Sequence, residues 1–362
     1  MKYNVGLYGG SFDPLHQGHL NNMIQAAGEC DTLYIMLSYS RQRDSVPMEI
    51  RYRWILACTN HLNNVEIIPI EDILTRKQHY DRECWEKGAN DIKHAIGKPI
   101  DIVYCGTGYE DSQIFETLYP ESEIKYFDRT FIPISSSQMR KDIYTYWNFL
   151  PQPCRPYYCK KVLIVGTEST GKSTLTRNLA NFYNTNYVHE VGRDRCDEAG
   201  KEEFMNFDDL AYNLICQKRE ELEAIKTSNK LLFIDTDAIT TLFYAFLLLS
   251  PEKVEKLEHL TTAITEIMDF DLIIFLEPVK KPMQDGTRNE EILNNQEKYS
   301  LDLKSLLNNY KIPIFEVDGE YDERYRKVID IITEQLNIQP YYNENVNSFD
   351  FENFKERLFS SN

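Results

Sequence analysis

Two glycine-containing loops constrain how this chain folds, because each lies between a β-prone run and a helical pattern. The first, residues 10–19, reads Gly-Ser-Phe-Asp-Pro-Leu-His-Gln-Gly-His, and the second, residues 166–173, reads Gly-Thr-Glu-Ser-Thr-Gly-Lys-Ser. Glycines at such turns let the backbone approach a phosphate closely, and a following helix N-terminus favours the negative charge. Both strings are therefore typical of loops that bind nucleotide phosphates. Their spacing of about one domain length predicts two phosphate sites in two domains.

The remaining sequence alternates apolar, strand-like runs with helical patterns, which predicts parallel, doubly wound sheets. The expected fold class is α/β, with two doubly wound parallel-sheet domains, the first Rossmann-like and the second a P-loop kinase domain. The predicted strands span residues 3–8, 32–37, 65–70, 101–105, 123–127, 161–165, 230–234, 271–276 and 313–317. The predicted helices span residues 18–27, 48–61, 83–95, 111–118, 172–183, 207–226, 238–248, 252–268, 290–307 and 322–335.

The domain boundary is expected at Pro151-Gln-Pro-Cys-Arg-Pro156, because three prolines in so short a stretch disfavour regular structure. The prediction is a first domain over residues 1–150, a linker over 151–160, a second domain over 161–338 and a C-terminal tail over 339–362. The alternative is that the proline-rich stretch is a surface loop inside one domain.

Composition limits the classes of protein to which the chain can belong. A hydrophobic fraction of 42% and a charged fraction of 27% are normal for a soluble globular protein. The net charge of −17 argues against a nucleic-acid surface, which needs clustered Lys and Arg. No apolar run is long enough to span a membrane. The eight cysteines lack paired spacing, and no secretory signal is present, so a cytoplasmic protein with reduced thiols is expected. A homo-oligomer is possible.

The first loop suits stabilisation of charge on an α-phosphate. His16 and His19 are three residues apart, with Gly18 at the loop-to-helix transition, so two imidazoles and a helix N-terminus are expected to face one point. Such a site works by positioning and charge stabilisation and needs no covalent nucleophile. The other residues expected to bind nucleotide here are Gly9, Gly10, Ser11 and Phe12.

A second string, Pro133-Ile-Ser-Ser-Ser-Gln-Met-Arg140, places three hydroxyls ahead of a short helix. Serines at this position cap the helix and leave backbone amides for phosphate. Ser135, Ser136 and Ser137 are therefore candidate nucleotide ligands, and Arg140 is the candidate cation for the β- and γ-phosphates. The string also fits a capped helix without a ligand.

The second loop has the pattern Gly-x4-Gly-Lys-Ser between a strand and a helix. Its backbone N–H groups are expected to surround the β-phosphate, with Lys172 bridging phosphate oxygens and Ser173 supplying a hydroxyl to Mg²⁺. The residues expected to contact nucleotide are Gly166, Thr167, Glu168, Ser169, Thr170, Gly171, Ser173 and Thr174.

Charged residues beyond this loop are candidates for the same site. Asp235 and Asp237 follow an apolar strand and are expected on one side of an extended segment. Asp235 is then expected near Mg²⁺ and Asp237 near a ribose hydroxyl. Asp237 also fits a helix cap. Glu190 and Arg193 suit a sugar diol and a phosphate. Arg288, in Asp285-Gly-Thr-Arg288, suits a closing lid that reaches the transferred phosphoryl group, or a polar turn.

The first string together with Ile134-Ser-Ser-Ser-Gln-Met-Arg140 resembles the HxGH nucleotidylyltransferases, in particular nicotinamide-mononucleotide adenylyltransferases. The resemblance implies that His16, His19 and Arg140 contact ATP. Ser137 stands where Thr is usual, which keeps the hydroxyl. Arg51-Tyr-Arg-Trp54 resembles the helix after the flexible loop in NadR-type adenylyltransferases, and Arg51 is a candidate for substrate binding. Trp85 falls where these enzymes place an aromatic residue near the nicotinamide ring, although a core aromatic fits equally.

The ordered set GTESTGKST, EVGR, FIDTD and DGTR resembles the ribosylnicotinamide-kinase half of NadR-type proteins, and the two resemblances together cover about residues 1–335. They imply a bifunctional NAD salvage enzyme that uses ATP and Mg²⁺, makes NMN from nicotinamide riboside, and makes NAD from NMN. The helix-turn-helix repressor domain of some bacterial members is not expected. One alternative is a P-loop domain that only senses nucleotide. Another is an adenylyltransferase for phosphopantetheine or a sugar phosphate.

Overall fold

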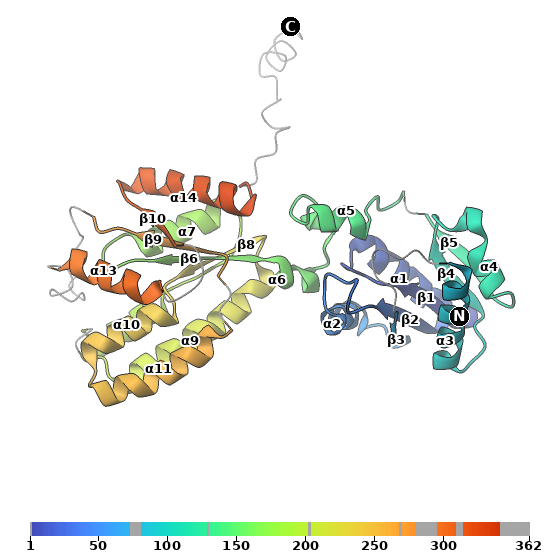
Figure 1. Ribbon diagram of the computed structural model, residues 1–362, viewed down its shortest axis with the longest axis horizontal. Coiled ribbons are helices and arrows are strands. Elements are labelled where there is room, and N and C mark those ends of the chain that lie inside the picture. Colours follow the sequence, from blue (N-terminus) through green and yellow to red (C-terminus); the bar gives the residue numbers. More distant parts are fainter. Residues whose placement is uncertain are drawn as a thin grey trace, which may run out of the picture. The chain divides into compact units, whose positions relative to one another are not determined.

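The structure is a computed structural model that describes residues 2–72, 81–128, 130–201, 204–267, 270–279, 295–308 and 314–340. The chain divides into two compact units, unit 1 (Met1–Tyr158) and unit 2 (Cys159–Asn362), and each is considered by itself (Figure 1). The predicted lid residue Arg288, the start of the predicted helix 290–307, and residues 341–362 of the predicted tail lie outside the described residues.

Unit 1 contains a parallel sheet with strand order β3-β2-β1-β4-β5. Its strands are β1 (Tyr3–Gly10), β2 (Cys30–Tyr39), β3 (Val65–Glu71), β4 (Ile102–Gly106) and β5 (Glu123–Phe127). Its helices are α1 (Gln17–Glu29), α2 (Met48–Thr59), α3 (Arg82–Ile96), η1 (Glu110–Ser112), α4 (Ile114–Leu118), α5 (Ser136–Lys141), η2 (Trp147–Phe149), η3 (Gln152–Cys154) and α6 (Arg155–Tyr158). The order reverses between β1 and β4, which is where ligands bind in doubly wound sheets.

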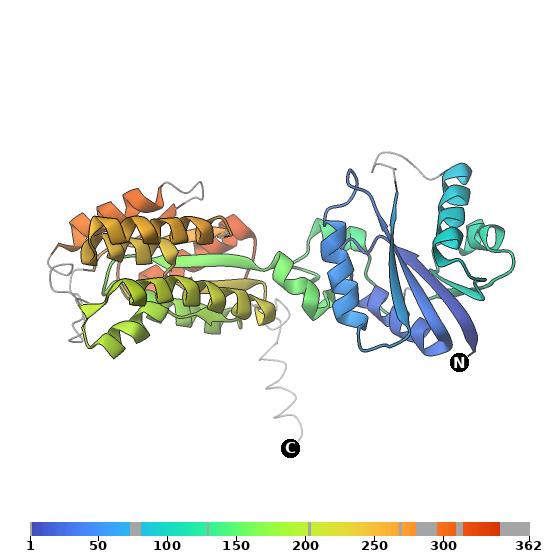
Figure 2. The ribbon, with the colours of Figure 1, turned by 90° about the horizontal axis from the view of Figure 1, so that it is seen from below.

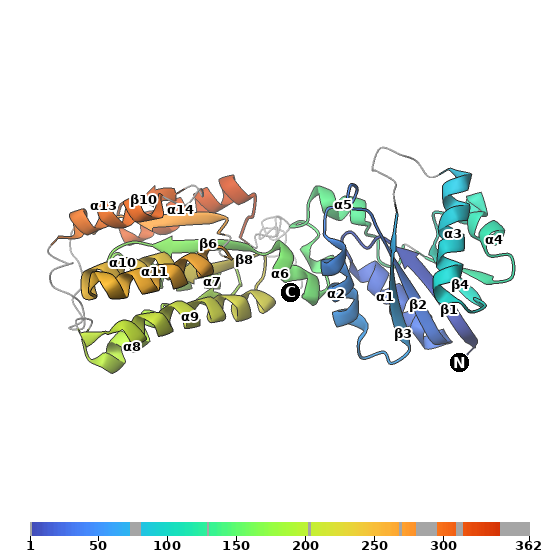
Figure 3. The same ribbon diagram turned by 60° about the horizontal axis from the view of Figure 1, so that its bottom comes forward.

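Helices cover both faces of this sheet, with α1 and α2 on one face and α3 and α4 on the other (Figure 3). The alternation of buried side chains along the strands sets this arrangement. Val5 and Leu7 of β1 and Tyr34 and Met36 of β2 pack in one hydrophobic cluster with Ala89 of α3. The intervening residues of the same strands therefore point toward α1 and α2.

Unit 2 contains a second parallel sheet with strand order β10-β9-β6-β8-β7. Its strands are β6 (Lys160–Val165), β7 (Tyr187–Val188), β8 (Leu231–Asp235), β9 (Leu272–Leu276) and β10 (Ile314–Val317). Its helices are α7 (Lys172–Phe182), α8 (Val191–Ala199), α9 (Phe207–Ala224), η5 (Ile225–Thr227), α10 (Ala238–Leu248), α11 (Pro251–Thr265), α13 (Gln296–Leu307) and α14 (Tyr321–Leu336). The prediction of two doubly wound parallel sheets is confirmed.

The helices of unit 2 also form two layers (Figure 2). Helices α9, α10 and α11 pack together on one side of the sheet, and α7 and α14 pack together on the other. The central strands are buried on both faces: all five residues of β8 and of β9 are buried. Continuous apolar runs of this kind are expected in a parallel sheet covered by helices.

The proline-rich stretch differs from the irregular linker that the sequence predicts. It forms η3 and α6, which belong to unit 1, and η3 has a proline at its first turn. Proline is tolerated there because the first N–H groups of a helix have no intrahelical partner. Tyr157 and Tyr158 lie against Trp54 of α2, with ring centroids 5.5 and 6.0 Å away. Aromatic packing therefore fixes this stretch to unit 1.

The close packing around β1 can be tested at Gly6, whose neighbours Cys30 and Tyr104 come from β2 and β4. A Cβ atom at Gly6 would lie 2.3 Å from Cys30 Sγ and 3.2 Å from Tyr104 Cε2, both buried. We expect Gly6→Ala to destabilise the protein by about 1–3 kcal/mol, because overpacking a tight core forces its neighbours to shift. Adding Cys30→Ala should recover part of the loss. Thermal unfolding measures both.

Gly28 supplies a matched control, because a Cβ atom there meets no atom within 4 Å. Gly28→Ala lies in α1 and should leave stability unchanged or raise it by up to about 1 kcal/mol, as helix propensity predicts. Equal melting temperatures for Gly6→Ala and Gly28→Ala would contradict the packing described here.

Candidate nucleotide sites

The predicted nucleotidyl-transfer loop follows β1, at the carboxyl edge where the strand order of unit 1 reverses. His16 is the N-cap of α1, and its Nδ1 accepts a hydrogen bond from the main-chain N–H of His19 at 3.4 Å. The two imidazole rings stack with centroids 3.6 Å apart. Because Nδ1 of His16 is an acceptor, the proton of its neutral ring lies on Nε2, which is then a donor. The structure thus brings both predicted histidines together.

The serine string lies beside this loop. Ser135 caps α5 through a capping box with Gln138, and Ser136 Oγ donates to the carbonyl of Pro14 at 3.1 Å. Arg140 donates to the carbonyl of Asp13 and, at 3.1 Å, to Ser137 Oγ. Its side chain is otherwise exposed. The helix is therefore capped, and Arg140 lies next to the histidine loop, while nucleotide binding by this string stays a prediction.

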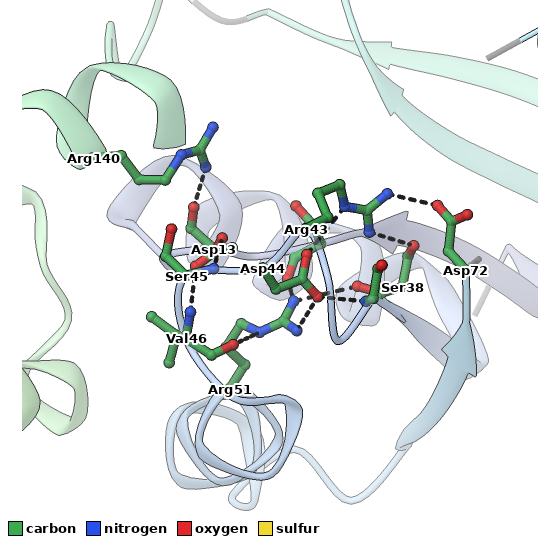
Figure 4. A network of polar contacts seen from close by, with 11 residues as sticks. Asp13, Ser38, Arg43, Asp44, Ser45, Val46, Arg51, Asp72 and Arg140 are labelled. Atoms are coloured by element: carbon green, nitrogen blue, oxygen red, sulfur yellow. Dashed lines mark hydrogen bonds and ion pairs between the residues drawn. The ribbon is translucent and has the colours of Figure 1, made fainter. Parts of the chain in front are cut away.

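Arg51 does not have the exposed position that a direct substrate contact needs. Its side chain is completely buried, and it donates to the carbonyls of Val46 (2.9 Å), Ser38 (3.3 Å) and Ser11 and to the Asp44 carboxylate (2.5 Å), as Figure 4 shows. The prediction of substrate binding by Arg51 is therefore corrected. Its guanidinium ties the loop after β2 to the histidine loop.

A second set of contacts fastens the same two loops. The Asp13 carboxylate accepts hydrogen bonds from the backbone N–H groups of Ser45 (2.8 Å) and Val46 (3.1 Å). Arg43 pairs with Asp44 at 3.1 Å and with Asp72, beyond β3, at 2.6 Å (Figure 4). The loops after β1, β2 and β3 are thus joined at one edge of the sheet, which restricts the position of the histidine loop.

Trp85 lies in the first turn of α3, at the same edge of the sheet. It is half-buried and meets the rings of Tyr109 and Phe115 edge-on, at 5.9 and 5.8 Å. Tyr109 follows β4 and is exposed. The structure therefore shows an aromatic cluster beside the strand ends, and a role for Trp85 in stacking on a nicotinamide ring stays a prediction.

In unit 2, the Gly-x4-Gly-Lys-Ser loop joins β6 to α7. Gly166 and Gly171 have φ values of 153° and 90°, and a Cβ atom at Gly166 would lie 2.6 Å from the Leu276 carbonyl. Lys172 is buried, and its Nζ donates to the carbonyl of Thr167 at 3.1 Å. The lysine therefore curls back over its own loop, where a phosphate held by the backbone amides would lie.

Two residues that sequence reasoning missed hold this loop from outside. Arg324 of α14 is buried and donates to the Thr170 carbonyl at 3.0 Å and to the Gly319 carbonyl at 2.7 Å. Gln296 of α13 donates to the Glu168 carbonyl at 2.9 Å. Both come from parts of the chain far from the loop in sequence, and no local pattern marks them.

A cavity of about 200 Å³ adjoins the loop. Eight predicted residues line it: Glu168, Ser169, Gly171, Lys172, Ser173, Thr174, Glu190 and Arg193. The other predicted residues of this unit that the structure describes are buried and do not line the cavity: Gly166, Thr167, Thr170, Asp235 and Asp237. The side of the cavity away from the loop is formed largely by α9 and α10, which sequence reasoning did not assign to the site.

Asp235 and Asp237 have different positions. Burial, and then the neighbouring Glu190 charge, raise the pKa of Asp235 to about 6, while Lys172 and Ser173 act in the opposite direction. Asp237 is fully buried and caps α10, accepting from Thr240 N at 3.0 Å and Thr240 Oγ1 at 2.8 Å. The argument that both carboxylates share one side of an extended segment is wrong, because Thr236 between them has a φ of 70°.

Gln217 of α9, also missed, fixes the strand end that carries Asp235. Its side-chain amide donates to the carbonyls of Asp235 and Thr236, both at 3.2 Å, and its Oε1 accepts from Val191 N at 3.0 Å. One buried side chain thereby links the start of α8 to the connection between β8 and α10. The sequence signal was a polar residue at a core-facing position of an amphipathic helix.

A magnesium ion fits this donor set. Ser173 and Asp235 are close enough that the Ser173 hydroxyl lowers the pKa of the Asp235 carboxyl, and a hydroxyl and a carboxylate are the oxygen ligands that Mg²⁺ takes beside phosphate. Among the described residues, no group of three His, Cys, Asp or Glu side chains forms a metal site. A Mg²⁺ ion bound mainly through phosphate and water needs no such group.

Known proteins resemble each unit separately. The Cytidylyltransferase-like family matches residues 7–155, and the AAA domain family matches residues 161–324. Unit 1 is similar to phosphopantetheine adenylyltransferase of Streptococcus pneumoniae (strain Hungary19A-6), at 35% identity over 39% of this chain and 84% of that protein. In the described residues, no helix is both long and apolar enough to cross a bilayer.

Other relatives span both units. The Trifunctional NAD biosynthesis/regulator protein NadR of Escherichia coli (strain K12) is 28% identical over 93% of this chain and 85% of its own length. A solved NadR protein in complex with NR has the same fold, with a TM-score of 0.79, 24% identity, and coverage of 94% of this chain and 98% of that one.

Fold and sites together define a two-domain α/β protein in which a cytidylyltransferase-like domain precedes a P-loop domain. In the comparisons above, NadR proteins are relatives whose similarity spans both domains. The chain is similar to the Escherichia coli NadR protein over 93% of its length.

The raised pKa of Asp235 has a consequence for stability. Because its folded-state pKa of about 6 exceeds the usual 3.8, the ionised carboxylate opposes folding, and stability falls as the pH rises from about 4 to about 6. We expect Asp235→Asn to stabilise unit 2 above pH 6, by up to about 3 kcal/mol, with a smaller gain near pH 4. Calorimetric melting without nucleotide and Mg²⁺ measures this.

The control is Asp302→Asn, which removes an exposed carboxylate of α13 and should leave the melting temperature unchanged. A loss of stability in Asp235→Asn at pH 7 would show that the carboxylate is stabilised in the fold, contrary to its burial beside Glu190.

Proposed function

We propose that the chain is a bifunctional NAD salvage enzyme that uses ATP in both units. Unit 2 phosphorylates nicotinamide riboside to NMN, and unit 1 joins NMN to the adenylyl group of a second ATP, giving NAD and pyrophosphate. The observation that carries this proposal is the similarity to NadR proteins through both units, with a phosphate loop at the reversal of each sheet. One solved NadR protein was bound to NR and another to NAD and AMP-PNP, which supports these ligands.

In unit 2, the 5′-hydroxyl of the riboside attacks the γ-phosphorus of ATP, the β–γ bridging bond breaks, and ADP leaves. The loop amides and Lys172 stabilise the charge on the transferred phosphoryl group. Glu190, one of the carboxylates that line the cavity, accepts the hydroxyl proton or holds the hydroxyl in place. Ser173 and Asp235 would hold a Mg²⁺ ion, which would neutralise phosphate charge. A lid role for Arg288 remains part of the proposal.

In unit 1, a phosphate oxygen of NMN attacks the α-phosphorus of ATP, and the α–β bridging bond breaks. His16 Nε2 and His19 donate to the phosphate oxygens on which charge develops. Arg140, adjacent to the loop and exposed, pairs with the departing pyrophosphate. Arg51 and Asp13 act through the backbone, because they fix the loop that carries the histidines.

A different acceptor for unit 1 is favoured by one comparison. The phosphopantetheine adenylyltransferase match concerns unit 1 alone and leaves unit 2 without a role. A panel of NMN, nicotinate mononucleotide and 4′-phosphopantetheine, assayed for pyrophosphate release, separates the substrates. Preference for phosphopantetheine would overturn the proposed function of unit 1.

Variants at the two loops should separate the two activities. Lys172→Ala should reduce NMN formation at least about 100-fold and leave adenylylation of supplied NMN intact, because it removes charge stabilisation in unit 2 only. His19→Ala should reduce adenylylation of NMN by a similar factor and leave NMN formation intact. Chromatography of NMN and NAD from full-length protein, with Mg·ATP and either nicotinamide riboside or NMN, measures both steps.

The matched control is Lys256→Ala, which removes an exposed lysine of α11 and should change neither rate. If wild-type protein formed neither NMN nor NAD, the proposed function would be wrong. If wild-type NMN formation were as slow as that of Lys172→Ala, unit 2 would be a nucleotide sensor.

A further inference from the structure

The buried face of α9 carries an amide whose oxygen has no partner. Asn213 is 3% exposed, and its Oδ1 accepts no hydrogen bond from any residue that the structure describes. A buried polar atom left unpaired is costly, and native proteins pair nearly all such atoms. Asn213 also lines the cavity beside the P-loop. An unpaired acceptor on a cavity wall indicates a ligand that supplies the missing donor.

The position of Asn213 is fixed by its neighbours on the helix. Leu210 and Gln217 lie three residues before and four residues after it, so the three side chains share one face of α9, and all three line the cavity. Gln217 is bonded to the carbonyls of Asp235 and Thr236 and to Val191 N, which ties this face to the phosphoryl-transfer end. Those bonds hold in place the helix face that carries Asn213.

Asn213 also lies near Glu190, one of the carboxylates that line the same cavity. A Cβ atom at Gly192 would be 3.2 Å from Asn213 Nδ2 and 4.0 Å from Glu190 Cγ. Polar groups from α8 and α9 therefore gather beside the phosphate loop, whereas Met205, Leu210 and Leu248 make other parts of the wall apolar. A ligand with a polar sugar near the loop and a flat ring beyond it matches this distribution.

We propose that Asn213 recognises a ribose hydroxyl of the nucleoside that unit 2 phosphorylates, the 2′- or the 3′-hydroxyl donating to Oδ1. This inference rests on the proposed kinase function and adds a residue that selects ribosides over deoxyribosides. The ribose carries the 5′-hydroxyl that reaches the phosphate loop, so its other hydroxyls lie close to Glu190 and Asn213. The carboxamide of the ring is the other donor that such a substrate offers, and the experiment separates the two.

The experiment compares full-length wild type and Asn213→Ala on four substrates: nicotinamide riboside, its 2′-deoxy and 3′-deoxy analogues, and nicotinic acid riboside. We expect Asn213→Ala to lower kcat/KM for nicotinamide riboside and for nicotinic acid riboside about tenfold, the loss of one hydrogen bond. For the analogue that lacks the recognised hydroxyl, wild type and variant should have the same kcat/KM. The KM for ATP should not change.

Leu210→Ala, on the same face of α9, is the matched control and should affect all four substrates alike, because it alters packing and not a hydrogen bond. If Asn213→Ala lowered kcat/KM by the same factor for all four substrates, its role would be structural and the inference would be overturned. If kcat/KM for nicotinic acid riboside alone were unchanged by Asn213→Ala, Asn213 would bind the carboxamide of the ring. That result would also contradict recognition of a ribose hydroxyl. If wild type phosphorylates none of the ribosides, the proposed function itself fails, and this inference with it.

Discussion

The close approach of a backbone loop to the end of a central parallel strand is the constraint on which both sites depend. In unit 1 the loop follows β1, and in unit 2 it follows β6, with the Gly166 Cα close to the Leu276 carbonyl of the neighbouring strand. A helix begins directly after each loop, so amides and a positive helix end point away from the sheet. The sheet supplies the rigid support, and the loop supplies the phosphate contacts. Two unrelated chemistries can use this arrangement because the loop side chains differ between the units.

Each loop is held by buried polar side chains that need not touch a ligand. Arg51 and Asp13 fix the histidine loop, and Arg324 and Gln217 fix the P-loop and the strand end beside it. Their hydrogen bonds go mainly to main-chain carbonyls and amides, which set the path of the backbone. A site built this way loses activity when a supporting residue changes, even though the substrate never contacts that residue.

Local sequence signals predicted the fold and the phosphate loops, because a loop pattern between a strand and a helix specifies its own conformation. They did not predict the supports, since Arg324 lies more than one hundred residues from the loop it holds. Arg51 was assigned to substrate from a resemblance, because a sequence does not reveal that a side chain is buried. The proline stretch was taken as irregular, yet prolines begin its helical turns and tyrosines pack it on α2. Asn213 and Gln217 were visible only as polar breaks in the apolar face of a predicted helix.

The account requires two separate nucleotide sites in one polypeptide, and counting bound nucleotide tests this most directly. Calorimetric titration of the full-length chain with a non-hydrolysable ATP analogue and Mg²⁺ should give two analogues bound per chain. Lys172→Ala should bind one, in unit 1 only. A single analogue bound per wild-type chain at saturation would contradict the account.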